Sequence, residues 1–278
     1  MIGVIGASGN VGSSLVRELA AAGQDVVAVS RSGGSGSGRV QHVAADLAEP
    51  GKVRDALRGV ASVFLMIAGA GEGLDLGALV SAVADTGARR VVLLSSIGTR
   101  SRPTAMSHEP LRVLEKEVMA SALAWTILRP GGFASNAKAW IPGIRARGVV
   151  EAPFGDIAIP VVDPADIASM ASAALLHERH AGAVYELTGP APISPRAQMH
   201  AIAEATGVPL TFVDLGRAQA AAAWRTFMPA AVIETTLDAL GNPNELERRV
   251  SPDIERALGR PPRPFSAWAA RNADAFRS

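Results

Sequence analysis

The sequence predicts an α/β fold: a doubly wound parallel sheet followed by a smaller C-terminal α/β lobe. Short apolar runs alternate with amphipathic stretches through the first half of the chain, which is the pattern of a repeated β-α unit. The first apolar run, over 2–5, is followed at once by glycines that recur every third residue. The chain has 278 residues, of which 48% are hydrophobic, so it can bury the large core that such a sheet requires.

The elements of the sheet are expected in succession from residue 2 to residue 128. The strand over 2–5 leads into a helix over 13–22 that Gly23 closes. Further strands are expected over 26–29, 40–44, 60–67, 90–96 and 125–128, and further helices over 52–57, 74–86 and 111–122. The run over 90–96 lacks polar alternation, as expected of a parallel strand covered on both faces.

The turn formed by Gly6, Gly9 and Gly12 lies between a predicted strand and a predicted helix. Glycines let the backbone approach a pyrophosphate closely, and the first N–H groups of the helix direct a positive dipole end at its phosphates. The order of strand, turn, helix and strand favours nucleotide binding over an ordinary structural turn. We therefore expect a Rossmann-like site whose first contacts come from Gly6, Ser8, Gly9, Asn10, Val11 and Gly12.

The end of the second strand indicates which dinucleotide is bound. NAD-selective folds place an Asp or Glu there to bind the adenosine ribose, whereas this chain has Arg31. A guanidinium can form paired hydrogen bonds with the additional phosphate of NADP, so the sequence favours NADP(H). Dual specificity and a solvated loop cation are the alternatives. The glycine-rich run over 33–38 is interpreted as a flap that orders Arg39 on that phosphate, or as a plain solvent loop.

The other expected ligand contacts follow the carboxyl ends of the strands, where ligands of such sheets lie. They are Asp46, Leu47, Ile67, Ala68, Gly69, Ser95, Pro130, Gly131, Gly132 and Phe133. Met66, Phe133, Trp140 and Trp224 could line a flat substrate pocket, although apolar residues at these spacings also form ordinary core.

The character of the sequence changes after residue 136. Short strands are expected around Val149 and over 157–162 and 184–187, helices over 165–176 and 195–206, and a helical tail from Ala218. We interpret 1–135 as the dinucleotide-binding core and 136–278 as a smaller substrate lobe that closes over the ligand and returns strands to the core.

Composition excludes several classes of function. A net charge of +1 without blocks of like charge gives no reason to expect a nucleic-acid partner, and the absence of cysteine excludes disulfides and thiolate chemistry. His177 and His180 are expected to be solvated cations at a helix end rather than metal ligands, and no metal is expected. There is no charged leader and no apolar run of about 18 residues, so we expect a cytoplasmic protein without a membrane partner. No oligomeric state is predicted.

Several motifs, taken together, resemble the NmrA-like family of atypical short-chain dehydrogenase/reductases. They are the glycine turn, the run over 115–136 with Arg129-Pro-Gly-Gly-Phe133, the segments over 161–167 and 185–189, and the closing segment over 259–268. The resemblance covers nearly the whole chain. It implies a Rossmann core with a small C-terminal lobe that binds NADP(H), in a family that contains quinone and dye reductases as well as redox-sensing regulators.

The resemblance also implies where catalytic groups should lie. Short-chain reductases use a Tyr four residues before a Lys on the helix after the fifth strand; Lys116 fits the Lys position and would hold the ribose, but Arg112 replaces the Tyr. Tyr185, the only tyrosine, is expected to be a packed strand residue. Ser96 and His108 are further catalytic candidates, with local backbone capping as the alternative for each.

The missing phenol favours one class of substrate. Reduction of a ketone requires a proton delivered to an alkoxide, whereas a quinone or conjugated dye accepts hydride to give a delocalised anion that water can protonate. We therefore expect an NADPH-dependent oxidoreductase that reduces a quinone-like or conjugated small molecule. The alternatives are a non-catalytic NADP(H) sensor that engages a protein partner and, ranked last, an isomerase or epimerase.

Overall fold

The main sheet of the protein is parallel and doubly wound. The structure is a computed structural model that describes residues 1–278 apart from 68, 70, 72, 227 and 278. Within that part of the chain, a seven-stranded sheet has the order β3-β2-β1-β4-β5-β6-β8. Its strands are β1 (Ile2–Ile5), β2 (Val26–Ser30), β3 (Val40–Ala44), β4 (Ser62–Leu65), β5 (Arg90–Leu94), β6 (Ala124–Pro130) and β8 (Ala183–Leu187). The strands from β1 to β6 pair in parallel and the order reverses at β1, which confirms the predicted fold class.

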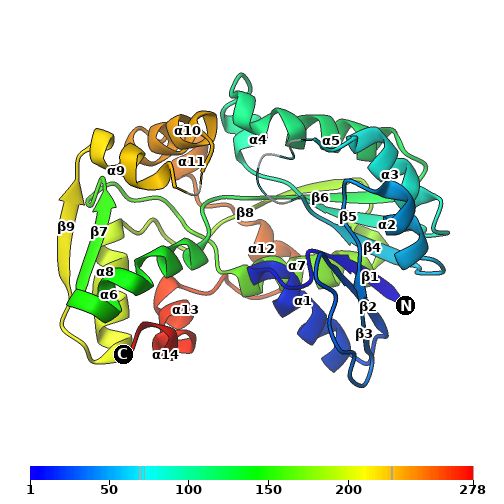
Figure 1. Cartoon of the computed structure of the whole chain (residues 1–278), viewed down its shortest axis with the longest axis horizontal. Coiled ribbons are helices and arrows are strands. Elements are labelled where there is room, and N and C mark those ends of the chain that lie inside the picture. Colours follow the sequence, from blue (N-terminus) through cyan, green and yellow to red (C-terminus); the bar gives the residue numbers. More distant parts are fainter. Residues whose placement is uncertain (68, 70, 72, 227, 278) are drawn as a thin grey trace. The chain divides into compact units, whose positions relative to one another are not determined.

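Helices cover both faces of this sheet (Figure 1). On one face, α1 (Asn10–Ala21) packs against α7 (Pro164–Leu176), which also contacts β4, β5 and β6. On the other face, α3 (Leu76–Ala84) packs between α2 (Pro50–Ala56) and α5 (Glu109–Ala120). The apolar core of this second layer includes Leu57, Leu79, Leu93 and Leu114, all fully buried. Burial on both faces explains why the strands are continuous apolar runs.

The chain forms two compact units. The first contains residues 1–104, 108–130 and 164–186, and the second contains 105–107, 131–163 and 187–278. The sequence predicted one boundary, after residue 135, whereas each of these units is made of several separate segments of the chain. Residues 164–186 belong with the first unit because α7 packs on α1 and β8 lies next to β6 in the main sheet.

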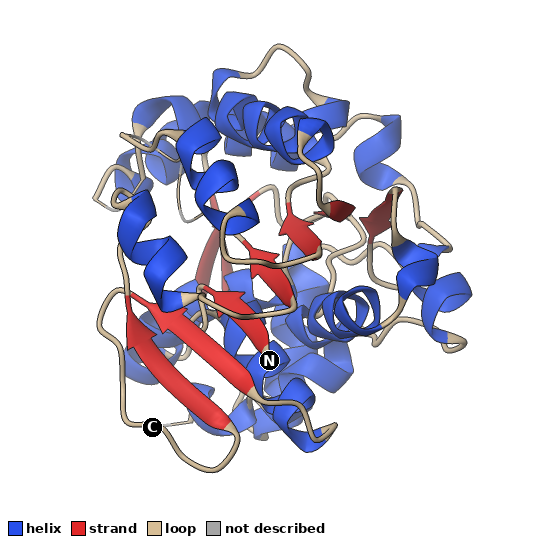
Figure 2. Ribbon diagram, turned by 90° about the vertical axis from the view of Figure 1, so that its right-hand side faces the viewer, coloured by secondary structure: helices blue, strands red, loops and turns tan. Residues whose placement is uncertain are grey.

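The second unit is built around a separate pair of parallel strands, β7 (Val149–Pro153) and β9 (Thr211–Leu215), labelled side by side in Figure 1. Figure 2 draws the strands of the main sheet as red arrows with blue helices on either side. Its core includes Ile144, Met199, Phe265 and Trp268. Its helices are α6 (Ile141–Arg147), α8 (Pro195–Thr206), α9 (Arg217–Trp224), α10 (Ala230–Gly241), α11 (Glu245–Arg248), α12 (Asp253–Leu258), α13 (Phe265–Arg271) and α14 (Ala273–Phe276), with a 3-10 helix, η2 (Ala134–Trp140), before α6. In the part of the chain that the structure describes, no helix is long and apolar enough to cross a membrane.

In this unit one strand prediction was wrong and one strand was missed. The run over 157–162 forms only isolated bridges, Ile159 with Ile193 and Val162 with Phe133, because Pro160 has no N–H to donate to a ladder. Conversely, β9 was not predicted, since it is largely exposed and lacks the apolar alternation of a buried strand.

The prediction for His180 was also wrong, because its side chain is buried at 2% exposure rather than solvated. Its Nδ1 atom lies 2.8 Å from the Tyr185 hydroxyl, and its ring packs edge-on against the tyrosine ring. Burial, reinforced by the charge of Arg179, lowers the pKa of His180 below its usual value. Tyr185 is half-buried on β8 and is engaged in this contact.

Candidate functional site

The carboxyl ends of the parallel strands bring the predicted ligand-binding segments to one edge of the main sheet. Ile5 pairs with Val29 on β2, Val4 with Phe64 on β4, and Leu94 on β5 with Leu128 on β6. The segments that follow these strands therefore lie along a common edge, where ligands of doubly wound sheets bind. They are 6–12 after β1, 31–33 after β2, 45–47 after β3, 66, 67 and 69 after β4 and 95–98 after β5.

The glycine turn is held tightly against this edge. The amides of Gly6 and Ala7 both donate to the Val29 carbonyl oxygen, at 3.0 and 3.1 Å. Gly6 has a φ of +75°, and a Cβ atom there would lie 2.5 Å from the Met66 Sδ atom. A Cβ atom on Gly12 would overlap the Gly6 carbonyl oxygen. Glycine is therefore required for backbone conformation at residue 6 and for close packing at residue 12.

The first turn of α1 fits a pyrophosphate. Its N-cap residue, Gly9, has no side chain to cap the helix, and the turn contains no acidic residue. Ser8, Gly9 and Asn10 are exposed, whereas Val11 is buried against the core. The helix end thus presents backbone N–H donors and a positive dipole without a competing carboxylate, which is the arrangement that binds phosphate groups.

Arg31 and Arg39 lie at opposite ends of β2. Arg31 is exposed directly after Ser30, where the strand ends at the ligand edge. Arg39 instead precedes β3 and forms an ion pair with Asp25 at 2.9 Å, beside the amino end of β2. The interpretation of Arg39 as a phosphate ligand was therefore wrong, because a chain that enters a parallel strand must return to the opposite edge.

The glycine-rich run over 33–38 makes this return alongside β3. A Cβ atom on Gly33 would lie 3.3 Å from Ala44, one on Gly34 would lie 3.3 Å from His42, and one on Gly36 would lie 2.8 Å from the Val40 carbonyl oxygen. The run therefore follows β3 in the reverse direction, and glycine permits this close approach.

The residues after β3 and β4 that were predicted to contact the cofactor also make contacts within the protein. The Asp46 carboxylate accepts a hydrogen bond from the Ala48 amide at 3.0 Å, and Leu47 and Ile67 pack on the apolar core. Gly69 has a φ of +63° and is exposed, whereas Ala68 lies outside the described residues. Contact of these residues with a cofactor stays a prediction.

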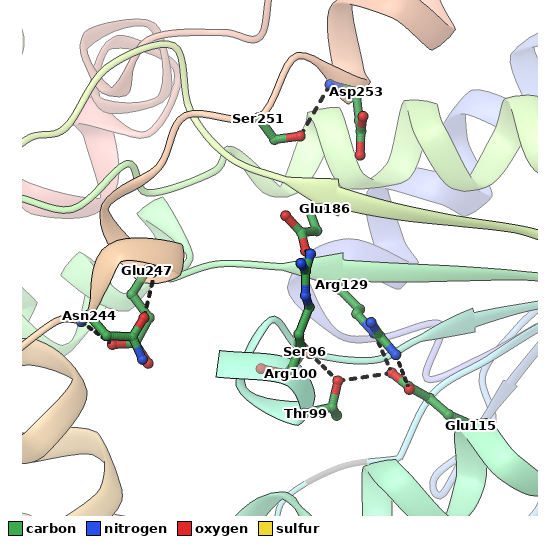
Figure 3. Close-up of polar contacts among 10 residues, drawn as sticks. All are labelled: Ser96, Thr99, Arg100, Glu115, Arg129, Glu186, Asn244, Glu247, Ser251 and Asp253. Atoms are coloured by element: carbon green, nitrogen blue, oxygen red, sulfur yellow. Dashed lines mark hydrogen bonds and ion pairs between the residues drawn. The ribbon is translucent and has the colours of Figure 1, made fainter. Parts of the chain in front are cut away.

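Glu115 is the centre of a buried polar network after β5 and β6 (Figure 3). Its carboxylate, at 4% exposure, accepts hydrogen bonds from Arg129 Nε at 2.9 Å and from Arg129 Nη2 at 2.5 Å. It also accepts from the hydroxyls of Ser95 and Thr99. These hydrogen bonds raise the pKa of Arg129 above its usual value. The Ser95 hydroxyl donates its proton to Glu115 and the Ser95 amide donates to the Leu128 carbonyl oxygen, so a cofactor contact at this residue would be one in which Ser95 accepts a hydrogen bond.

A second ion pair lies close to the first. Arg100, on α4 (Gly98–Ser101), contacts the Glu186 carboxylate of β8 at 2.6 Å, and the charge of Glu186 also acts on Arg129. The short helix after β5 is thereby fixed to α5 through Thr99 and to β8 through Arg100. This anchoring sets the position of Ser96 and Gly98 at the ligand edge.

The His108 side chain lies beside the segment that follows β5, where it contacts Gly98. A Cβ atom on Gly98 would overlap the His108 imidazole, so the ring packs directly on this glycine. His108 is half-buried at the N-terminus of α5. The Ser96 hydroxyl accepts a hydrogen bond from the Gly98 amide at 3.1 Å, so Ser96 has the capping role that was its alternative interpretation. Ser96, Gly98 and His108 therefore lie together after β5.

Lys116 and Arg112 lie one turn apart on α5. Lys116 is exposed, whereas the adjacent Glu115 is buried. Arg112, at the position of the missing tyrosine, donates to the Glu109 carboxylate at 2.6 Å and to the Arg102 carbonyl oxygen at 3.4 Å. An arginine held in this way cannot act as a general acid, since its guanidinium does not lose a proton in the working range.

The division between the two units falls at the end of β6. Pro130 accepts a hydrogen bond from the Ile97 amide within the first unit, and Gly131, Gly132 and Phe133 belong to the second. Trp140 and Trp224 pack against different apolar clusters of the second unit. These two tryptophans, which were both considered for a flat pocket, are thus not part of one cluster.

Sequence reasoning did not assign roles to Glu115, Thr99 and Arg129. A signal was available for Glu115, which lies between Leu114 and Val118 on the buried stripe of α5. A carboxylate at an apolar position of a helix predicts a buried partner. The identity of that partner depends on the tertiary fold and cannot be read from spacing.

The sheet order, the glycine turn and the uncapped α1 define a dinucleotide-binding protein of the doubly wound class. A family model described as NAD(P)H-binding matches residues 6–178. A (4-alkanoyl-5-oxo-2,5-dihydrofuran-3-yl)methyl phosphate reductase from Streptomyces griseus is 36% identical over 284 residues and covers 99% of each chain. An NAD(P)H azoreductase from Xenophilus azovorans is 30% identical over 290 residues, again with 99% of each chain covered.

The chain belongs to this NAD(P)H-binding family, which confirms the predicted resemblance to NmrA-like reductases, the NAD(P)H cofactor and the class of NAD(P)H-dependent oxidoreductase. Solved structures agree on the fold. An NADPH-dependent quinone oxidoreductase from Escherichia coli, complexed with NADPH, aligns with a TM-score of 0.77 at 21% identity, covering 98% of this chain and 99% of that chain. A nucleoside-diphosphate-sugar epimerase from Staphylococcus aureus aligns with a TM-score of 0.81 at 16% identity, covering 97% and 99%.

Proposed function

We propose that this protein uses NADPH to reduce a conjugated, electron-poor small molecule. The observation that carries the proposal is the absence of a phenol acid at the expected position. Arg112 occupies that position and is bound to Glu109, while Tyr185, which lies on β8, contacts His180. Without a tyrosine to protonate an alkoxide, the suitable acceptor is one whose hydride adduct is already a stabilised anion.

The relatives named above support this choice of acceptor. The furan name describes a ring double bond conjugated with both a lactone and an alkanoyl carbonyl, and azo compounds and quinones are also conjugated acceptors. Each can delocalise the charge left by hydride addition. These compounds share conjugation and not a common shape. We therefore propose a conjugated acceptor and not a quinone in particular.

The residues of the site would have separate roles in binding the dinucleotide, delivering a proton and positioning these groups. The first turn of α1 would bind the pyrophosphate, and Lys116 would reach the ribose. When bound, the reduced dinucleotide supplies a hydride. His108, packed on Gly98 beside Ser96, is the candidate to deliver the proton that accompanies this two-electron reduction. Glu115 and Arg129 would hold these groups in position, so that rate enhancement comes mainly from orientation.

Consumption of NADPH against a panel of acceptors tests this proposal. Purified protein saturated with NADPH should reduce a quinone, an azo dye or an acyl-substituted unsaturated lactone, with one NADPH oxidised per two-electron reduction. A saturated ketone should not be reduced. Turnover of the ketone in preference to the conjugated compounds would contradict the proposal, and saturated binding without any turnover would favour the redox sensor.

The choice of NADPH over NADH is tested with Arg31→Ala. Loss of charge-assisted hydrogen bonds to the additional phosphate should weaken NADPH binding by on the order of 1–3 kcal/mol, or roughly 5- to 150-fold, and leave NADH binding nearly unchanged. Titration of both nucleotides measures this difference. Arg39→Ala is the matched control, since Arg39 is paired with Asp25 at the other end of β2 and should affect neither nucleotide. Equal losses for both nucleotides with Arg31→Ala would rule out phosphate recognition.

A further inference from the structure

A cavity of about 490 Å³ lies at the amino edge of the main sheet, opposite the edge that carries the glycine turn. The letter N in Figure 1 marks the start of β1 at this edge. The end of α7 forms part of the wall, and so do the first residues of four adjacent strands, Ile2 of β1, Ser62 of β4, Arg90 of β5 and Ala124 of β6. All the lining residues belong to the first compact unit, so the cavity is formed within that unit. Its volume is typical of a small-molecule site.

Arg90 carries a positive charge that the protein balances only in part. Its Nη1 atom donates to the Leu175 carbonyl oxygen at 2.6 Å, whereas its Nε atom is buried and has no hydrogen-bond partner in the described part of the chain. Among the described residues that line the cavity, only Glu178 has a carboxylate, which lies 3.6 Å from Arg90 Nη2 and is 94% exposed. Water screens so exposed a partner. The Arg90 guanidinium is therefore incompletely paired, which is unfavourable until an anion completes it.

Arg89 adds a second guanidinium to the wall. Its backbone is fixed, because its amide donates to the Ala61 carbonyl oxygen and its own carbonyl oxygen accepts from the Ala124 amide, both at 3.0 Å. Arg89 is exposed, and its side chain makes no hydrogen bond or ion pair with any described residue. With Glu178 as the negative side chain among the described residues of the wall, the two arginines leave the cavity with an excess of positive charge.

The rest of the wall favours an organic ligand over a bare inorganic ion. Ile2 and Leu175 are buried, and Ala61, Ala124 and Leu176 also line the cavity. Such side chains stabilise a hydrocarbon group that leaves water, whereas a guanidinium forms paired hydrogen bonds with a carboxylate. The wall thus offers an apolar surface next to a pair of cations.

We propose that this cavity is a binding site for an organic carboxylate. The carboxylate pairs with Arg89 and Arg90, and a short hydrocarbon body lies against Ile2 and Leu175. Since the expected dinucleotide binds at the opposite edge of the sheet, both ligands bind at the same time. The inference goes beyond the proposed function and does not rest on it.

Calorimetric titration of octanoate into NADPH-saturated protein is the first test. We expect saturable binding at a single site, with a dissociation constant of about 1 mM or below. Two comparison compounds, 1-octanol without the charge and inorganic phosphate without the hydrocarbon, should each bind at least about 10-fold more weakly. The proposal is overturned if octanoate shows no saturable binding, if either comparison compound binds equally well, or if octanoate binds only when NADPH is absent. Turnover is not measured, so failure of the acceptor panel leaves this result unaffected.

Arg89→Gln locates the site, since it removes a guanidinium that has no partner among the described residues. Octanoate binding should weaken roughly 5- to 20-fold and NADPH binding should stay unchanged. Arg89→Lys keeps the charge without the paired geometry and should give an intermediate affinity. Arg58→Gln is the matched control: it makes the same change of charge in the same unit, at a guanidinium that is 2.9 Å from Asp55 and does not line the cavity. It should bind octanoate as the wild type does. Wild-type affinity in Arg89→Gln, or equal losses in Arg89→Gln and Arg58→Gln, would refute binding in this cavity.

Discussion

Replacing Gly12 with alanine is expected to abolish tight NADPH binding. A Cβ atom at this position would overlap the carbonyl oxygen of Gly6, which is backbone and cannot rotate away as a side chain would. The first turn of α1 must then move away from the glycine turn, and the N–H groups that bind the pyrophosphate lose their alignment with it. We expect NADPH affinity to fall by at least about 100-fold, or roughly 2.7 kcal/mol, in a fluorescence titration.

The helix position itself does not explain this loss, because alanine normally stabilises a helix relative to glycine by roughly 0.5–1 kcal/mol. Gly51→Ala is the matched control. Gly51 is the second residue of α2, and a Cβ atom there would have no neighbour within 4 Å. This variant should unfold at the wild-type temperature or higher and bind NADPH normally. Wild-type affinity in Gly12→Ala would show that close packing of the turn is not needed for binding.

The glycine turn was predictable because its requirement is local. Strand, turn and helix follow one another within 12 residues, and glycine is required by the backbone conformation at residue 6 and by close packing against residue 6 at residue 12. The class of the sheet was predictable as well, since continuous apolar runs between amphipathic helices permit few topologies and favour a doubly wound parallel sheet. The predicted strands over 40–44 and 90–96 accordingly agree with β3 and β5 within two residues.

The unpredicted features depend on partners that are distant in sequence. Glu115 and Arg129 meet because α5 packs on β5 and β6, and Ser95 and Thr99 join them from the segment after β5. His180 is buried because β8 extends the main sheet and Tyr185 covers its ring. The residues around His180 in the sequence are polar, which led to the prediction of a solvent-exposed side chain. Its burial depends on tertiary packing and could not be predicted from the local sequence.

Replacing Glu115 with glutamine is expected to produce the largest loss of stability. The change removes the negative charge but keeps the size of the side chain, so Arg129, with a side chain 18% exposed, loses the carboxylate that it contacts and keeps only the weaker influence of Glu186. Breaking a buried ion pair from one side costs about 3–5 kcal/mol, and the partial exposure of Arg129 places the expected loss near the lower end of this range. Urea unfolding with an unchanged m-value measures it.

Glu109→Gln provides the matched control, since it makes the same substitution in the same helix, also opposite an arginine. The pair of Glu109 with Arg112 is solvent-exposed on the glutamate side, so its loss should cost less than about 1 kcal/mol.

The two variants should also differ in catalysis. Glu115 holds Ser95 and Thr99 on either side of Ser96, so its replacement should lower kcat more than it raises KM for NADPH, whereas Glu109→Gln should change neither by much. Equal stability loss in both variants would show that the buried network adds no more than a surface ion pair, and that α4 is positioned by its apolar packing instead.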